Sequence, residues 1–274
     1  MKNFALIGYP LGHSLSPVIH RKLFKIQGIE ADYSLIEIPP EQLAEKFEAL
    51  KSNRGFNVTI PHKVNIIPLL DELDERAALF GAVNTVKVDE NGKTKGYNTD
   101  CSGFLNALKT ANIPLSGKVL LCGSGGVARM FAFEAVLADC DLTIAVREND
   151  VEAAKTIAAE ISEKLGKSAK VILLGEAEGS YDLIINATPV GMFPNADACV
   201  IDKSIIGQAG AVFDAVYNPA ETQFIRYAKE AGIKYSNGLS MLVWQAAVAE
   251  EIWNGSRFTQ EDIEPVIEIT NKEL

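Results

Sequence analysis

Lys63 and Asp100 are the side chains in this sequence best suited to moving a proton. Lys63 follows the stretch Asn57-Val58-Thr59, which reads as the end of a buried strand, and Asp100 closes a second polar stretch, Asn98-Thr99-Asp100. Ligands of open α/β sheets bind beyond the carboxyl ends of the strands, so we expect Thr59 and Lys63 to face one crevice, with Asp100 beside it. A lysine and an aspartate that converge there suit proton transfer coupled to hydride transfer. Taken singly, Lys63 is more typical of a solvated surface charge, and Asp100 of a helix N-cap.

Ser14 and Ser16 lie in the loop Gly8–Pro17 between the first predicted strand and the first predicted helix. Hydroxyl groups both donate and accept hydrogen bonds, so two serines in such a loop suit a small ligand rich in oxygen. Ser16 followed by Pro17 is also typical of an ordinary helix start, with the serine as N-cap and the proline in the first turn. Ser14 has no such local explanation.

The segment 123–128 indicates a dinucleotide site. It reads Gly-Ser-Gly-Gly-Val-Ala, matches G-x-G-x-x-A, follows a predicted strand and opens a predicted helix. In this motif the first glycine permits a tight turn, the second lets a pyrophosphate approach the backbone, and the small last residue lets the helix pack on the strand. Free N–H groups at the helix start then bind phosphate.

The next predicted strand ends at Val146-Arg147-Glu148, where the type of charge selects the cofactor. An acidic residue binds the ribose 2′-hydroxyl of NAD, and a basic residue binds the 2′-phosphate of NADP. Both types of charge are present here, so the local chemistry leaves NADP and NAD open.

The elements expected around these residues alternate between strand and helix, which predicts an α/β fold with mostly parallel sheets. In the first hundred residues we expect strands at 3–8, 33–38 and 56–60, helices at 16–27 and 41–51, and a hairpin turning at Asn91-Gly92. A further helix is expected at Phe104–Thr110. A second series begins at Lys118, with strands at 119–122, 142–146, 171–174, 183–186 and 211–213. Its helices are expected at 127–137, 151–165 and 222–231, followed by helices at 239–253 and from 259. We therefore predict a substrate-binding domain at 1–100, a Rossmann-type dinucleotide-binding domain at 101–236, and a cleft between them. Periodicity alone leaves open which domain the last two helices join, and we assign 237–274 to the first.

Composition narrows the class of protein further. The 274 residues carry 26 basic and 36 acidic side chains, a net charge of −10, which argues against nucleic acid or an anionic membrane as a partner. The four cysteines, Cys101, Cys122, Cys140 and Cys199, have no metal-binding or CxxC spacing, and His13, His20 and His62 fit no familiar metal site. We expect free thiols, no metal and a cytoplasmic location, with His20 on a helix surface or in a hydrogen bond.

Seven sequence blocks, spread in order from Gly8 to Ala246, resemble the signature blocks of the shikimate dehydrogenase family. They are GYPLGHSLSP, GFNVTIPHK, GAVNT, NTD, GSGG, DAVYNP and GLSMLVWQA. The resemblance implies reversible oxidation of shikimate to 3-dehydroshikimate with NADP, in aromatic amino acid biosynthesis. It also implies a monomer or a homodimer.

The resemblance further implies roles for individual residues. Lys63 and Asp100 are the implied catalytic pair. The implied substrate-binding residues are Ser14, Ser16, Thr59, Lys63, Asn84, Asp100, Tyr217 and Gln245. The implied cofactor-binding residues are Gly123, Ser124, Gly125, Gly126, Val127, Ala128, Arg147, Thr188 and Gly238.

Departures from the family pattern leave two alternatives. The adenosine-binding block usually reads Asn-Arg-Thr, and here only Arg147 is kept, with Glu148 and Asp150 expected to repel a 2′-phosphate. An NAD-dependent or dual-cofactor quinate/shikimate dehydrogenase is therefore one alternative. A ligand-binding regulator without catalysis is the other, and the retention of Lys63 and Asp100 argues against it.

Overall fold

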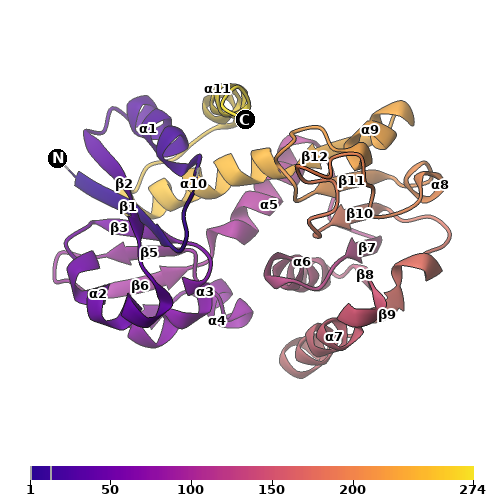
Figure 1. Cartoon of the computed structure of the whole chain (residues 1–274), viewed down its shortest axis with the longest axis horizontal. Coiled ribbons are helices and arrows are strands. Elements are labelled where there is room, and N and C mark those ends of the chain that lie inside the picture. The colour runs from indigo at the N-terminus through magenta and orange to yellow at the C-terminus, as the bar shows by residue number, and fades with distance from the viewer. Residues whose placement is uncertain (1, 13) are drawn as a thin grey trace. The chain divides into compact units, whose positions relative to one another are not determined.

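The computed structural model describes residues 2–12 and 14–274. The chain divides into two compact units, which are described separately. The first unit comprises residues 1–103 and 243–273, and the second comprises residues 104–242 with Leu274. Each unit contains one six-stranded sheet (Figure 1). The fold is α/β, as the alternating pattern predicted. Within the described residues, no helix is both long enough and apolar enough to cross a membrane.

The sheet of the first unit has the strand order β2-β1-β3-β5-β6-β4. Its strands are β1 (Lys2–Gly8), β2 (Ala31–Glu37), β3 (Gly55–Val58), β4 (Glu72–Leu73), β5 (Thr85–Val88) and β6 (Thr94–Tyr97). β1 pairs in parallel with β2 and β3, whereas β5 is antiparallel to both β3 and β6, the second pair forming the predicted hairpin. This sheet is therefore mixed, because β5 runs opposite to the other five strands.

The first unit contains the following α-helices and short 3-10 helices (η), some of them only in part. They are α1 (Ser16–Gln27), η1 (Pro40–Gln42), α2 (Leu43–Leu50), α3 (His62–Asn65), η2 (Ile67–Leu69), α4 (Glu75–Phe80), the start of α5 (Thr99–Thr110), the end of α10 (Gly238–Asn254), and α11 (Gln260–Asn271). The core residues of α2 are Leu43, Phe47 and Leu50, the helically spaced residues seen in the sequence. The segments α3, α4 and β4 carry too few residues for a periodic signal and were not predicted.

Two helix starts differ from the predictions. Leu15 is the N-cap of α1, so Ser16 is its first helical residue and does not cap it. Helix α5 begins at Thr99, before the expected start at Phe104, which places Asp100 inside its first turn and not at an N-cap. Asp100 therefore lies where the helix dipole favours a negative charge.

The sheet of the second unit is wholly parallel, with the strand order β12-β11-β10-β7-β8-β9. Its strands are β7 (Lys118–Cys122), β8 (Asp141–Val146), β9 (Lys170–Leu173), β10 (Leu183–Asn186), β11 (Ala211–Asp214) and β12 (Lys234–Asn237). Its other elements are α6 (Gly126–Leu137), η3 (Glu148–Asp150), α7 (Val151–Leu165), η4 (Leu174–Glu176), α8 (Lys203–Ile206) and α9 (Gln223–Glu230). The strand order reverses between β7 and β10, which makes this the Rossmann-type switch point where ligands of such sheets bind.

Candidate active site

Lys63 is held in place through the backbone of the short helix α3. The preceding residue, His62, is fully buried, and its Nε2–H donates to the carbonyl oxygen of Ile38 at 2.6 Å. The carbonyl oxygen of Lys63 itself accepts the N–H of Val83 at 2.8 Å. Helix α3 is therefore held by hydrogen bonds at His62 and at the backbone of Lys63, which limits the positions that the amine can reach.

The amine of Lys63 and the carboxylate of Asp100 lie together, as the sequence predicted they would. Lys63 Nζ donates to Asp100 Oδ2 at 2.7 Å. The two side chains are 32% and 20% exposed, so a small molecule can reach both groups. A partly desolvated ammonium–carboxylate pair with an open face can bind a hydroxyl group and exchange a proton with it.

Asn84 connects this pair to the start of α5. Its Nδ2 donates to Asp100 Oδ1 at 2.8 Å, and its Oδ1 accepts the N–H of Thr99 at 2.7 Å. The same oxygen is 3.2 Å from the hydroxyls of both Thr85 and Thr99. Asn84 is 3% exposed, so these contacts replace water almost entirely. Both ends of its amide are used, and Asp100 is thereby held between an ammonium and an amide.

Gln245, the polar exception on the apolar helix α10, joins the same cluster. Its Oε1 lies 3.3 Å from Asn84 Nδ2 and 3.4 Å from Thr99 Oγ1. The cluster extends beneath the site to Asn57, whose Nδ2 donates to Thr85 Oγ1 at 3.0 Å. Sequence reasoning assigned no role to Asn57, Thr85 or Thr99. A signal for Asn57 was available, because an amide in a strand whose residues are all buried must find partners.

Ser14, Ser16 and Thr59 lie at the expected ends of β1 and β3, and each is partly exposed. Ser14 Oγ accepts the N–H of Ser16 at 3.2 Å, so Ser14 does have a local structural role. The backbone of Thr59 is bonded to its neighbours: its N–H donates to Ile7, and its carbonyl accepts the N–H of His62. No hydrogen bond among the described residues joins these three hydroxyls to Lys63 or Asp100.

The two described histidines, His20 and His62, belong to no metal-binding cluster. His13 lies outside the described residues. His20 is fully buried and not on a helix surface, and its Nδ1 lies 2.8 Å from Oε1 of the buried Glu250. Burial lowers the pKa of His20 to about 3 and raises the pKa of Glu250 to about 9, so the two form a neutral hydrogen bond and not an ion pair. Within residues 2–12 and 14–274, no three His, Cys, Asp or Glu side chains gather to hold a metal.

The glycine loop of the second unit connects β7 to α6. Gly123 has a φ of 114°, and an added Cβ would lie 3.0 Å from Thr188 Cγ2 and 3.1 Å from the carbonyl oxygen of Ala187. Gly125 is the N-cap of α6 and offers no side chain to the free N–H groups of that helix. Ala128 is fully buried, as its packing role requires. The loop therefore leaves a helix start open to phosphate.

A cavity of about 400 Å³ lies against this loop. Its lining comprises Gly123, Ser124, Gly125, Val146, Arg147, Asp150, Ala153, Leu174, Ala187, Thr188, Pro189 and Val190. Arg147 and Thr188 thus lie in one lining with the glycine loop, whereas Gly126, Val127, Ala128 and Gly238 do not line this cavity. Glu148, expected to oppose a phosphate here, is exposed and also absent from the lining, whereas Asp150 is present.

Buried polar residues position Thr188. The N–H and hydroxyl of Thr188 both donate to Asn186 Oδ1, at 3.0 and 2.7 Å, and Asn186 Nδ2 donates to Asp214 Oδ1 at 2.9 Å. Asp214 is fully buried, and burial raises its pKa to about 6 even though Thr222, Val216 and Asn186 donate to it. Asn186 and Asp214 end neighbouring strands and were not predicted as site residues.

Tyr217 and Gly238 belong to the second unit and adjoin the end of β11 and the start of α10. Tyr217 is 41% exposed. A Cβ at Gly238 would lie 2.2 Å from the carbonyl oxygen of Ala215, so only glycine allows α10 to start against this loop.

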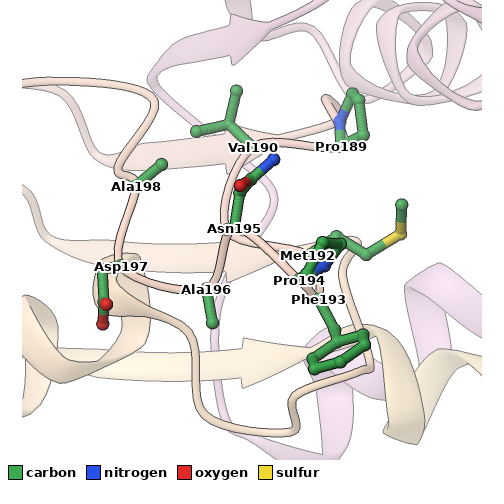
Figure 2. Close-up of a pocket in the computed structure, with 10 residues that line it drawn as sticks. Pro189, Val190, Met192, Phe193, Pro194, Asn195, Ala196, Asp197 and Ala198 are labelled. Carbon is green, nitrogen blue, oxygen red and sulfur yellow. The ribbon is translucent and has the colours of Figure 1, made fainter.

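The loop 189–198, which follows Thr188, surrounds a further cavity of about 680 Å³ (Figure 2). Met192 and Phe193 are 47% and 70% exposed. In the view of Figure 2 they lie at the opposite side of the loop from Asp197 and Ala198. This loop therefore presents apolar side chains to solvent directly after Thr188, Pro189 and Val190, which line the cavity of about 400 Å³.

Comparison with known proteins assigns the family. Residues 6–86 match the family model described as the shikimate dehydrogenase substrate binding domain. The chain is 43% identical over 262 residues to the shikimate dehydrogenase (NADP(+)) of Methanococcus maripaludis strain C6, covering 93% of this chain and 92% of the relative. It is 41% identical to the enzyme of the same name from Methanocaldococcus jannaschii, covering 98% and 94% of the two chains.

Solved structures agree with this assignment. A shikimate dehydrogenase in complex with NADP+ superimposes with a TM-score of 0.90 at 39% identity, covering 98% of this chain and 95% of that one. The enzyme of Thermus thermophilus, in complex with NADP(H) and shikimate, gives a TM-score of 0.88 at 34% identity, covering 98% and 100%. The protein described here belongs to the shikimate dehydrogenase family.

Proposed function

We propose that this protein catalyses the reversible, NADP-dependent reduction of 3-dehydroshikimate to shikimate, with Lys63 as the proton-transfer group. The observation that carries the proposal is the 2.7 Å contact between Lys63 Nζ and Asp100 Oδ2 in a site held by Asn84. NADP supplies the hydride acceptor, and the oxidised form of the substrate is a ketone. The proton of the reacting hydroxyl needs a base, and Lys63 is the amine placed to take it.

In the oxidation direction, the neutral amine of Lys63 takes the hydroxyl proton as the C–H bond of the same carbon is lost. In the reduction direction, its ammonium returns the proton to the forming alkoxide. Asp100, held by Asn84, orients the amine and accepts a hydrogen bond from a substrate hydroxyl. General acid–base help of this kind is worth about 10²- to 10⁴-fold in rate.

The remaining polar residues fit a polyhydroxylated carboxylate. We assign the substrate carboxylate to the hydroxyls of Ser14 and Ser16, and the ring hydroxyls to Thr59, Asn84 and Gln245. Tyr217 is proposed as a further substrate-binding residue. Asn84 and Gln245 support this assignment most directly, because both already belong to the hydrogen-bonded cluster around Asp100. Serine at both 14 and 16 favours shikimate over quinate.

The residues at the glycine loop fit NADP. The open start of α6 suits its pyrophosphate, Arg147 suits its 2′-phosphate, and the apolar part of the lining suits adenine. We therefore assign dinucleotide binding to the second unit and substrate binding to the first. We also propose a cytoplasmic location, in keeping with the four free thiols, and a monomer or homodimer.

Replacement of Lys63 tests the proposal. We expect Lys63→Ala to lower kcat by at least about 10²-fold, the lower limit for general acid–base help, while the Kd for shikimate changes much less. Lys93→Ala is the matched control, because Lys93 is a surface lysine of the same unit that pairs with Glu72. Wild-type activity should be assayed with shikimate and quinate, each with NADP and NAD. Near-normal turnover of Lys63→Ala, or no turnover of shikimate with NADP by the wild type, would refute the proposal.

A further inference from the structure

An ion pair between Arg147 and Asp150 lies in the wall of the cavity of about 400 Å³ beside the glycine loop, here called the nucleotide cavity. Arg147 Nε donates to Asp150 Oδ2 at 2.8 Å, and Arg147 Nη2 lies 2.8 Å from the same oxygen. Both residues line the cavity together with Gly123 and Ser124. Among the described residues of that lining, Arg147 is the only one with a cationic side chain.

Asp150 uses its carboxylate for this ion pair and not for a hydrogen bond to the helix that follows it. It is the N-cap of α7, a position where an aspartate normally accepts a hydrogen bond from the second or third N–H of the helix. Its side chain makes no such bond. The turn of η3, closed by the N–H of Asp150 donating to the carbonyl of Arg147 at 2.9 Å, brings the carboxylate to the guanidinium instead.

The pairing affects the part of Arg147 that a phosphate needs. A guanidinium binds a phosphate in bidentate fashion through two neighbouring N–H groups. Asp150 already occupies the Nε–Nη2 edge and neutralises the charge. A 2′-phosphate must therefore either displace the carboxylate or bind the remaining Nη1–Nη2 edge beside a negative charge.

We propose that Asp150 is a specificity-determining residue that competes with the 2′-phosphate of NADP for Arg147 and so weakens NADP binding. This inference rests on the proposed function of the cavity. NAD lacks the 2′-phosphate, so its binding does not depend on the competition. The chain therefore binds NADP less tightly, relative to NAD, than the same site with an unpaired arginine.

Calorimetric titration with NADP+ and NAD+, in the absence of shikimate, measures this directly. Arg147 is 76% exposed and Asp150 is 35% exposed, and pairs of this kind contribute modestly, so we expect Asp150→Asn to bind NADP+ about threefold to fivefold more tightly. Its affinity for NAD+ should stay within about twofold. Glu152→Gln is the matched control, because it removes a carboxylate from the first turn of α7 that pairs with Lys155 and not with Arg147.

A double-mutant cycle shows whether Asp150 acts through Arg147. In an Arg147→Ala background, Asp150→Asn should leave the Kd for NADP+ unchanged. Asp150→Ser, which restores a helix cap, should tighten NADP+ binding as Asp150→Asn does. Unchanged NADP+ affinity in both Asp150 variants, or an equal gain in the Arg147→Ala background, would overturn the inference. Failure of the wild type to bind either dinucleotide would instead refute the proposed function.

Discussion

Replacement of Asn84 by alanine separates the catalytic role of the polar cluster from its structural role. The change removes the amide that donates to Asp100 at 2.8 Å and the oxygen that accepts the N–H of Thr99 at 2.7 Å. Thr99 is 1% exposed, so its N–H loses its partner without gaining water. The hydroxyls of Thr85 and Thr99 are 3.1 Å apart and can bond each other, which limits the further loss.

The magnitude follows from these contacts. An unsatisfied buried N–H costs about 1–3 kcal/mol, and we expect the free energy of unfolding to fall by about 2–3 kcal/mol. Asp100 keeps Lys63 as a partner but loses the second contact that fixes its orientation. We therefore expect kcat to fall by about 10- to 100-fold, the scale typical of losing an oriented supporting contact. Urea unfolding and steady-state kinetics measure the two effects.

Two further variants make the test decisive. Thr94→Ala removes a buried hydroxyl of the same unit that donates to Asp71 at 2.8 Å, so it should destabilise the unit without changing kcat. Asn84→Asp keeps an acceptor for Thr99 but places a carboxylate against Asp100, so it should lose kcat at least as strongly as Asn84→Ala. If Asn84→Ala loses stability but keeps kcat, as Thr94→Ala is expected to, the cluster serves folding alone.

Two other predictions concern the buried pair and the start of α10. Burial raises the pKa of Glu250 from 4.5 to about 9, so between these values the folded state holds a proton that the unfolded state has released. The free energy of unfolding should therefore decline as pH rises from about 6.5 to 9. Below that window His20, whose pKa is lowered to about 3, acts in the opposite direction. Glu250→Gln should flatten that decline, which for one group is at most about 1.4 kcal/mol per pH unit, and an unaltered decline in urea unfolding at pH 7 and 8.5 would exclude Glu250 as its source. Gly238→Ala should destabilise the protein by about 1–3 kcal/mol, because its Cβ meets the carbonyl oxygen of Ala215 at 2.2 Å, and it should also lower kcat by displacing the loop that carries Tyr217. Gly207→Ala, whose Cβ has no neighbour closer than 3.5 Å, is the control, and equal thermal stability of the two variants would contradict this reasoning.

Local signals predicted most of the elements that carry the site. Helix α7 runs from Val151 to Leu165, the bounds predicted from the sequence, and the hairpin turns at Asn91-Gly92. The rule that ligands lie beyond strand ends also led to Lys63 and Asp100, which are in contact. Such signals depend on residues within a few turns or on one strand, so they can be recognised from the sequence without the tertiary structure.

The hydrogen-bond partners could not be predicted in the same way, because they depend on residues distant in sequence. Asn84 satisfies the start of α5, and this contact explains why that helix begins at Thr99, five residues before its apolar periodicity starts. His20 lies three and four residues before Leu23 and Phe24, on the buried face of α1, and Glu250, 230 residues away, offers it a partner there. In both cases a polar residue can be buried only because another element supplies the hydrogen bond.

Asp150 shows the same limit at the cofactor site, where two local rules compete. Its place before α7 predicts a helix cap, whereas its spacing of three residues from Arg147 permits an ion pair. Each interaction contributes about 1 kcal/mol, so the sequence alone does not show which of the two forms. The structure resolves the competition in favour of Arg147. From the sequence, Asp150 was expected only to repel a 2′-phosphate. In the structure its carboxylate pairs with Arg147, the side chain proposed to bind that phosphate. We therefore infer that Asp150, and not the exposed Glu148, controls the affinity for NADP.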